Sequence, residues 1–124
     1  MPKKIFLVDD DEFVRESLQA LLEAHAFTVD AFTSGQDFLR RRETASGGCL
    51  LLDIQMPGMS GFDLLKALRT RRDDTPVVFI TGRRDRSAEA QAAALGAVAL
   101  LDKPTPHAAL LAALEQALGL RNTP

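Results

Sequence analysis

The chain has 124 residues, of which 46% are hydrophobic and 26% charged, and its formal net charge is −2. This size and composition predict one globular domain with a single core and exclude an intrinsically disordered chain. The near-zero charge provides no basic surface of the kind that nucleic acids bind, so we expect no direct contact with nucleic acid.

The single cysteine, Cys49, cannot form an internal disulfide or a cysteine metal cluster. Its place in an apolar run predicts a buried thiol, which favours a reducing compartment. Only four apolar residues, at 5–8, precede the first acidic cluster. That run is too short for a signal peptide or a membrane span, so we expect a cytoplasmic protein with no membrane contact.

Short apolar runs alternate along the chain with segments of helical periodicity, and each alternation predicts a strand followed by a helix. Capping-box spacing at Ser34 and Ser60 marks two helix starts, Gly96 marks a helix end, and Thr105 with Pro106 predicts an N-cap and first turn. The expected strands are 4–8, 27–32, 49–52, 77–80 and 98–101, and the expected helices are 12–25, 34–42, 60–71, 87–95 and 106–118.

Five such units predict a parallel sheet covered by helices on both faces, with right-handed crossovers. Ligands of these sheets bind outside the carboxyl ends of the strands. Polar groups follow four of the expected strands: the acidic run at 9–12, Asp53, Thr81 and Lys103. We therefore expect these groups to share one pocket.

The carboxylates of Asp9, Asp10 and Asp53 would repel one another in such a pocket, by roughly 4 kcal/mol for two charges about 4 Å apart at an effective dielectric near 20. A divalent cation would relieve this repulsion, and hard oxygen ligands favour Mg²⁺ over zinc. The two histidines, His25 and His107, lie away from every expected strand end, and we expect them on the surface.

An ammonium from Lys103 and a hydroxyl from Thr81 beside these acids suit the stabilisation of a transferring phosphoryl group. The nucleophile could then be a carboxylate, which would give an acyl phosphate. Structural roles remain open for single residues: helix capping for Asp10 and Asp11, a strand-end turn for Asp53, and a helix cap or a plain strand position for Thr81. The X-Pro bond at Lys103-Pro104 is a candidate for a cis peptide.

Four segments together resemble the receiver domain of bacterial two-component response regulators. They are VDDDE at 8–12, LDIQMPGMSG at 52–61, ITG at 80–82 and DKP at 102–104. The resemblance covers nearly the whole chain and is closest to the branch that has a C-terminal helix-turn-helix output domain. It implies a flavodoxin-like doubly wound fold with strand order 2-1-3-4-5, a receiver domain over residues 1–120, and a tail or linker start at 121–124.

The resemblance also implies roles for individual residues. Asp53 would accept a phosphoryl group from a sensor histidine kinase or a histidine phosphotransfer protein. Mg²⁺ would be bound by Asp10, Asp53 and the backbone carbonyl of Gln55, with Asp9 acting through a water or by positioning. Thr81 and Lys103 would each contact a phosphoryl oxygen. The protein would be a signalling phospho-acceptor in transcription regulation, not an enzyme in the usual sense.

Two positions depart from the family. Leu100 replaces the usual aromatic residue three positions before the lysine, so aromatic rotation cannot report the movement of Thr81. Thr105 stands where an aromatic residue often follows the Lys-Pro pair. The last helix is apolar on nearly all sides at 108–114. This surplus predicts a partner surface, such as a homodimer, formed by the last two helices and the last strand.

Three other classes of protein fit the sequence less well. A phosphohydrolase of the haloacid dehalogenase type needs an acid two residues after its nucleophile, where this chain has Gln55. A receiver-like module that never takes phosphate usually lacks one of the key residues, and all of them are present here. A nucleotide-binding fold needs a glycine-rich loop after the first strand, where this chain has an acidic run.

Overall fold

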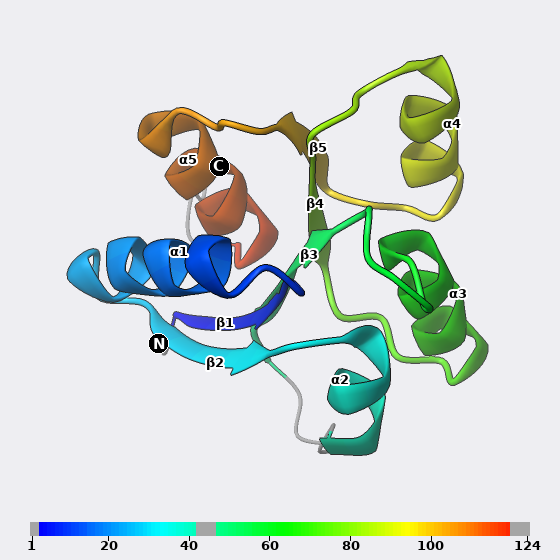
Figure 1. Ribbon diagram of the computed structural model, residues 1–124, viewed down its shortest axis with the longest axis horizontal. Helices are drawn as coiled ribbons and strands as arrows, with labels where there is room; N and C mark the ends of the chain where they lie inside the picture. Colours follow the sequence, from blue (N-terminus) through cyan, green and yellow to red (C-terminus); the bar gives the residue numbers. More distant parts are fainter. Residues whose placement is uncertain (1–2, 42–46, 120–124) are drawn as a thin grey trace.

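The computed structural model describes residues 3–41 and 47–119, within which strands and helices alternate along the chain (Figure 1). The strands are β1 (Lys4–Val8), β2 (Thr28–Phe32), β3 (Cys49–Asp53), β4 (Val77–Thr81) and β5 (Ala99–Asp102). The helices are α1 (Glu12–Ala24), α2 (Gly35–Arg41), α3 (Gly61–Thr70), α4 (Arg86–Ala94) and α5 (His107–Ala117). The strands pair in parallel in the order β2-β1-β3-β4-β5, which confirms the expected flavodoxin-like sheet.

The sheet separates two helix layers, with α1 and α5 on one face and α2, α3 and α4 on the other (Figure 1). Because successive side chains of a strand point to opposite faces, each central strand supplies both layers. In β3, Leu51 packs with the α1/α5 cluster, whereas Leu50 and Leu52 pack with the α3 cluster. Burial on both faces is the reason that β1, β3 and β4 read as continuous apolar runs.

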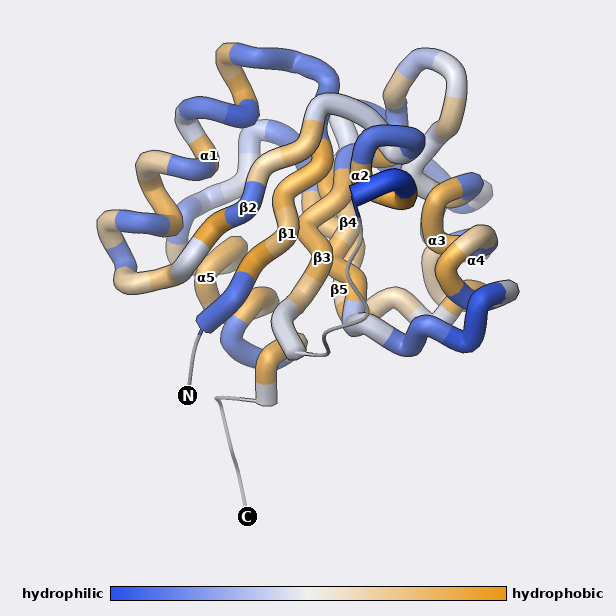
Figure 2. Tube along the Cα trace, turned by 90° about the horizontal axis from the view of Figure 1, so that it is seen from below, coloured by the Kyte–Doolittle hydropathy of each residue, from blue (hydrophilic) through white to orange (hydrophobic). Residues whose placement is uncertain are grey.

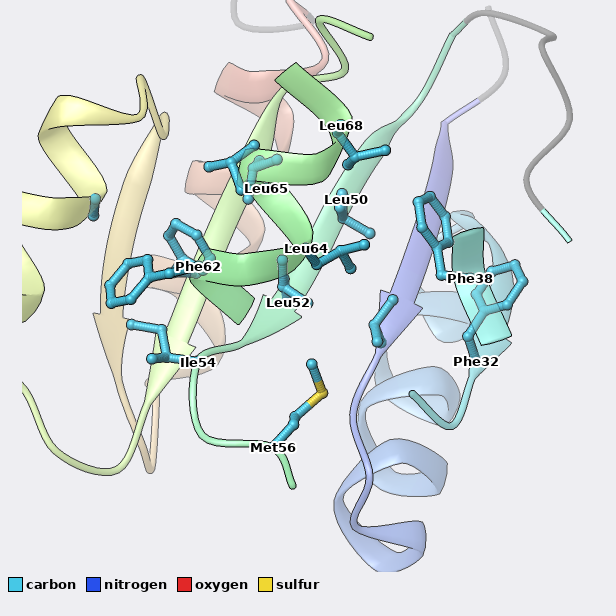
Figure 3. Packing of buried hydrophobic residues seen from close by; sticks show 14 of the residues in the cluster. Phe32, Phe38, Leu50, Leu52, Ile54, Met56, Phe62, Leu64, Leu65 and Leu68 are labelled. Atoms are coloured by element: carbon cyan, nitrogen blue, oxygen red, sulfur yellow. The ribbon is translucent and has the colours of Figure 1, made fainter. Parts of the chain in front are cut away.

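The hydropathy of the chain follows this layering, since the central strands are the most apolar segments and the helices alternate polar and apolar positions (Figure 2). The larger cluster lies between the sheet and α2, α3 and α4 (Figure 3). Phe62 of α3 meets Phe79 of β4 edge to face at 5.0 Å, and Phe32 meets Phe38 in the same way at 5.1 Å. Cys49 is buried as expected, and burial raises the pKa of its thiol to about 12.

The capping predictions were confirmed at three positions and wrong at a fourth. At the start of α2, Ser34 Oγ accepts from the backbone N–H of Asp37 at 3.0 Å. Ser60 and Asp63 form a complete capping box at the start of α3, and Gly96 follows α4 with a φ of 76°. Thr105 is not the N-cap of α5, because its hydroxyl donates to the carbonyl of Asp102 and Pro106 occupies the cap position in extended conformation. The peptide bond between Lys103 and Pro104 is cis.

The last helix has less free apolar surface than its composition predicts. Leu110 and Leu114 of α5 are buried against the sheet, and Leu111 and Leu118 are half-buried against the same cluster. Among residues 3–41 and 47–119, the only large hydrophobic side chain that is exposed is Phe13 of α1. None of the helices in those ranges combines the length and apolarity needed to cross a bilayer. The tail expected at 121–124 lies outside the described residues.

Candidate functional site

The acidic residues meet where β1 and β3 end side by side. Val8 pairs with Leu52 in the parallel register, so the residues that follow them, Asp9 and Asp53, leave the sheet next to each other. Carboxylate oxygens of Asp9, Asp10 and Asp53 lie within 4.8 Å of one another. Asp9 and Asp53 are buried and Asp10 is exposed, so two of the three charges are largely removed from water.

Asp9 is fully buried, and burial raises the pKa of its carboxyl group. The backbone N–H of Asp11, which donates to Asp9 Oδ1 at 2.9 Å, and the charge of Lys103 act in the opposite direction, while Asp53 adds to the rise. The guanidinium of Arg15 on α1 donates to the backbone carbonyl of Asp9 at 2.8 Å. Residue 9 is therefore held by both its side chain and its main chain.

Lys103 is the counter-charge of this pocket. Its ammonium donates to Asp53 Oδ2 at 2.9 Å and approaches Asp9 Oδ2 at 3.4 Å. Burial by itself lowers the pKa of Lys103, but the hydrogen bond and attraction of Asp53, joined by Asp9, outweigh it and raise the pKa. The backbone N–H of Lys103 also donates to the carbonyl of Thr81 at 2.8 Å, which fixes the lysine to the end of β4.

Asp53 is the last residue of β3 and is only 4% exposed. Its Oδ1 accepts from the backbone N–H of Gln55 at 3.2 Å, so the two carboxylate oxygens have different partners. Helix α3 starts directly against it: Gly61 donates to the carbonyl of Ile54 at 2.9 Å. A Cβ at residue 61 would lie 2.5 Å from the carbonyl oxygen of Asp53, so only glycine fits this close approach.

Thr81 ends β4 and is fully buried, with a saturated hydroxyl. The hydroxyl donates to Gln55 Oε1 at 2.8 Å and accepts from the backbone N–H of Arg83 at 3.0 Å. The carbonyl of Arg83 lies at 3.2 Å as a second, longer acceptor. In this arrangement the hydroxyl proton of Thr81 is directed to Gln55.

The loop after β4 reaches the edge strand of the sheet through Arg84. Its Nη1 donates to the carbonyl of Leu100 at 2.9 Å, and its Nε donates to Glu89 on α4 at 2.9 Å. The carboxylate of Asp102 lies 4.0 Å from Nη1. Arg84 thus links the loop, α4 and β5 at the position where Leu100 replaces the family's aromatic residue.

The residues present fit a hard divalent cation. All three side chains in the cluster are carboxylates, the ligand type that Mg²⁺ prefers, and two of them are buried, where a cation would offset their mutual repulsion. The two histidines are exposed, as expected, and His25 contacts the carbonyl of Leu21 on its own helix.

The structure thus brings together the side chains of Asp9, Asp10, Asp53 and Lys103, and joins Thr81 to them through Gln55. The sequence placed Arg84 in a basic loop beside the pocket but did not predict its contacts, and it predicted neither the side-chain contact of Gln55 nor the exposure of Phe13. Phe13, 79% exposed, could have been found, because it falls outside the apolar stripe of its helix. The contacts of Gln55 and Arg84 join residues that are distant in sequence and left no local pattern.

The protein is an α/β protein with a flavodoxin-like sheet, and a cluster of carboxylates paired with a lysine lies at the carboxyl ends of its strands. Comparisons with known proteins identify the family. Residues 5–115 match the model of the response regulator receiver domain, so the chain belongs to that family. It is the receiver domain of a two-component response regulator.

Among curated relatives, the transcriptional regulatory protein FixJ of Azorhizobium caulinodans is 40% identical over 115 residues, covering 93% of this chain and 54% of that protein. The structure of FixJ-N superposes with a TM-score of 0.90 at 31% identity, covering 100% of this chain and 99% of that one. Chemotaxis protein CheY4 of Vibrio cholerae gives a TM-score of 0.86 at 27% identity, covering 95% and 100%. The chain spans about half the length of the curated relatives it matches.

Proposed function

We propose that Asp53 is the phosphoryl acceptor of this receiver domain. The single observation that carries the proposal is the contact between Asp53 Oδ2 and the Lys103 ammonium at 2.9 Å, in a pocket where Asp53 is almost fully buried. A buried carboxylate at a strand end has no packing benefit. The burial of Asp53 is explained if its carboxylate is a reactive group. Lys103 would then balance the negative charge that the reaction adds.

The reaction is a phosphoryl transfer to the carboxylate. An oxygen of Asp53 attacks the phosphorus of a phosphohistidine, the P–N bond breaks, and its electron pair leaves on the imidazole nitrogen, which takes up a proton. The product acyl phosphate has a charge of about −1.5 to −2, which replaces the single negative charge of the free carboxylate. Lys103 then pairs with a phosphoryl oxygen, and Thr81 donates its hydroxyl to another.

Asp10, Asp53 and the backbone carbonyl of Gln55 would hold Mg²⁺, with Asp9 acting through a water or by positioning. The cation would supply positive charge for the oxygens of the transferring group. Support comes from the clustering of three carboxylates within 4.8 Å and from the raised pKa of the buried Asp9.

The donor would be a sensor histidine kinase or a histidine phosphotransfer protein. Phe13 supports a protein donor, because a large aromatic side chain that is 79% exposed stands in the first turn of α1, four residues after Asp9. Isolated aromatic exposure of this size beside a reactive site suits transient contact with a protein surface. The output would be transcriptional, as the name of FixJ indicates for that relative.

The response would pass through the loop at 81–86 to the face formed by α4, β5 and α5, which could serve a homodimer or an output domain. Arg84 supports this route, since it joins the loop to Leu100 and Glu89. Light scattering with and without a phosphoryl analogue tests the dimer, and a monomer under both conditions at high concentration would count against it.

The acceptor is tested by incubating the protein with radiolabelled acetyl phosphate and Mg²⁺. The wild-type protein should become labelled, Asp53→Asn should lose nearly all label, and Asp30→Asn, which changes an exposed acid on β2, should label like the wild type. The label should be released by hydroxylamine, as an acyl phosphate is. Equal labelling of Asp53→Asn and wild type would rule out the acceptor.

The same experiment separates this function from that of an aspartyl-phosphate hydrolase. A hydrolase of that type needs an acid two residues after its nucleophile, whereas Gln55 fills that position and uses its side chain to accept from Thr81. We therefore expect no turnover of a generic aryl phosphate above the Asp53→Asn background.

A further inference from the structure

Gln55 contacts both the proposed acceptor and the proposed switch residue. Its backbone N–H donates to Asp53 Oδ1 at 3.2 Å, and its side-chain oxygen accepts from Thr81 at 2.8 Å. The two residues lie 26 positions apart in sequence. A backbone metal role for Gln55 would not involve its side chain, so the contact with Thr81 needs a separate account.

A hydroxyl group has one proton to donate. The proton of Thr81 is directed to Gln55 Oε1, while the hydroxyl oxygen already accepts from the N–H of Arg83. Thr81 cannot donate to a phosphoryl oxygen and to Gln55 at the same time. Formation of the first contact therefore requires loss of the second.

We propose that the Gln55 side chain is a latch on Thr81: it holds the hydroxyl in the unphosphorylated position and so weakens the affinity of the site for a phosphoryl group. The proposal rests on the proposed function of Asp53. Gln55 acts through Thr81 and is a positioning residue, since no step of the transfer uses its amide.

Burial determines how strong this latch is. Gln55 is an exposed residue, so its amide oxygen can bind water when the contact opens. Thr81 is fully buried, so its hydroxyl must exchange Gln55 for the phosphoryl group or its analogue. The latch is then worth one net hydrogen bond, which corresponds to a change of about twofold to tenfold in an equilibrium constant. It biases the switch without locking it.

The test is a double-mutant cycle with beryllofluoride, a phosphoryl analogue, measured by calorimetric titration in the presence of Mg²⁺. Gln55→Leu keeps the size of the side chain and removes the acceptor, and it should bind the analogue about twofold to tenfold more tightly than wild type. In a Thr81→Val background, which has no hydroxyl to hold, the same substitution should have no effect. Gln91→Leu, an exposed glutamine on α4, is the matched control and should bind like wild type.

A second readout follows the switch directly. With no analogue present, the methyl resonance of Thr81 in Gln55→Leu should move toward its analogue-bound position, and Gln55→Glu, which keeps an oxygen acceptor, should leave it near the wild-type position. An unchanged affinity in Gln55→Leu, or an equal effect in the Thr81→Val background, would overturn the latch.

These outcomes are separate from a failure of the proposed function. If Asp53 is not the acceptor, Asp53→Asn will take label from acetyl phosphate as the wild-type protein does, or neither protein will take label. If only the latch is wrong, Asp53→Asn will lose the label, and Gln55→Leu will bind beryllofluoride as the wild-type protein does.

Discussion

The site has a charged half, formed by Asp9, Asp53 and Lys103, and a neutral half, formed by the side chains of Gln55 and Thr81 and the backbone of Arg83. The two halves are held by different kinds of interaction. In the charged half, buried ions face one another, and burial opposes the ionised carboxylate of Asp9. In the neutral half, ordinary hydrogen bonds satisfy one buried hydroxyl. Strong ionic interactions therefore lie where the phosphoryl group would bind, whereas weaker neutral hydrogen bonds lie where the response would begin.

The largest effect should come from removing the counter-charge. Lys103→Met leaves Asp9 and Asp53 without a cation and should lower the free energy of unfolding in chelator by about 1–3 kcal/mol, a range reduced because the lysine side chain is 27% exposed. Urea unfolding measures the change, and Lys66→Met on the exposed face of α3 is the control. Mg²⁺ should stabilise Lys103→Met more than wild type. An equal stabilisation of both proteins by Mg²⁺ would show that Lys103 is not the counter-charge of the carboxylates.

The next effect should come from Asp9, with the opposite sign. Asp9→Asn removes a buried charge and keeps an acceptor for the N–H of Asp11, so it should raise the melting temperature in chelator by about 4 °C, equivalent to about 1 kcal/mol. Asp10→Asn should raise it less, because Asp10 is exposed. Both variants should bind Mg²⁺ more weakly. A lower melting temperature for Asp9→Asn would contradict this account of the charged half.

The pH dependence of stability should reflect the charges of Lys103 and Asp9. The pKa of Lys103 is raised in the folded protein, so its contribution to stability is complete below its ordinary value of 10.5 and is lost as the pH rises through the folded value. The pKa of Asp9 is also raised, so its contribution is largest below 3.8 and is lost as the pH rises through its folded value. Urea midpoints across the alkaline range should fall more steeply for wild type than for Lys103→Met. Parallel curves would remove Lys103 as the cause.

The smallest effect on stability should come from the loop. Arg84→Met breaks contacts of a 40% exposed side chain and should cost only about 0.2–1 kcal/mol. This substitution should nevertheless reduce the changes in backbone amide chemical shift that beryllofluoride causes at Leu100 and in α4, as measured by nuclear magnetic resonance. Arg86→Met is the control. If beryllofluoride caused the same shift changes at Leu100 in Arg84→Met as in wild type, the response would not pass through Arg84.

The fold could be predicted because both faces of the central strands are buried, which makes their apolar runs continuous and their ends easy to place. The same property located Asp53 and Thr81, although each proved to be the last residue of its strand rather than the first of a loop. Thr105 was misassigned because a threonine next to a helix has competing backbone partners, and here its hydroxyl turned back to Asp102.

The latch at Gln55 could not be predicted for a different reason. A glutamine side chain has several rotatable bonds, and its choice of partner depends on a strand that is 26 residues away. The partial burial of Leu111 and Leu118 was also not predicted, because the apolar content of a helix does not show how much of each side chain the sheet covers.

The contact at Gly61 has a mechanical consequence. The first residue of α3 is bonded to Ile54 and leaves no room for even a methyl group beside the carbonyl of Asp53. The capping box of Ser60 and Asp63 stiffens the same turn. The backbone at the start of α3 is therefore in direct contact with the backbone of Asp53. A displacement of that helix end, for instance by a docked protein, would shift the residue that bears the proposed acceptor.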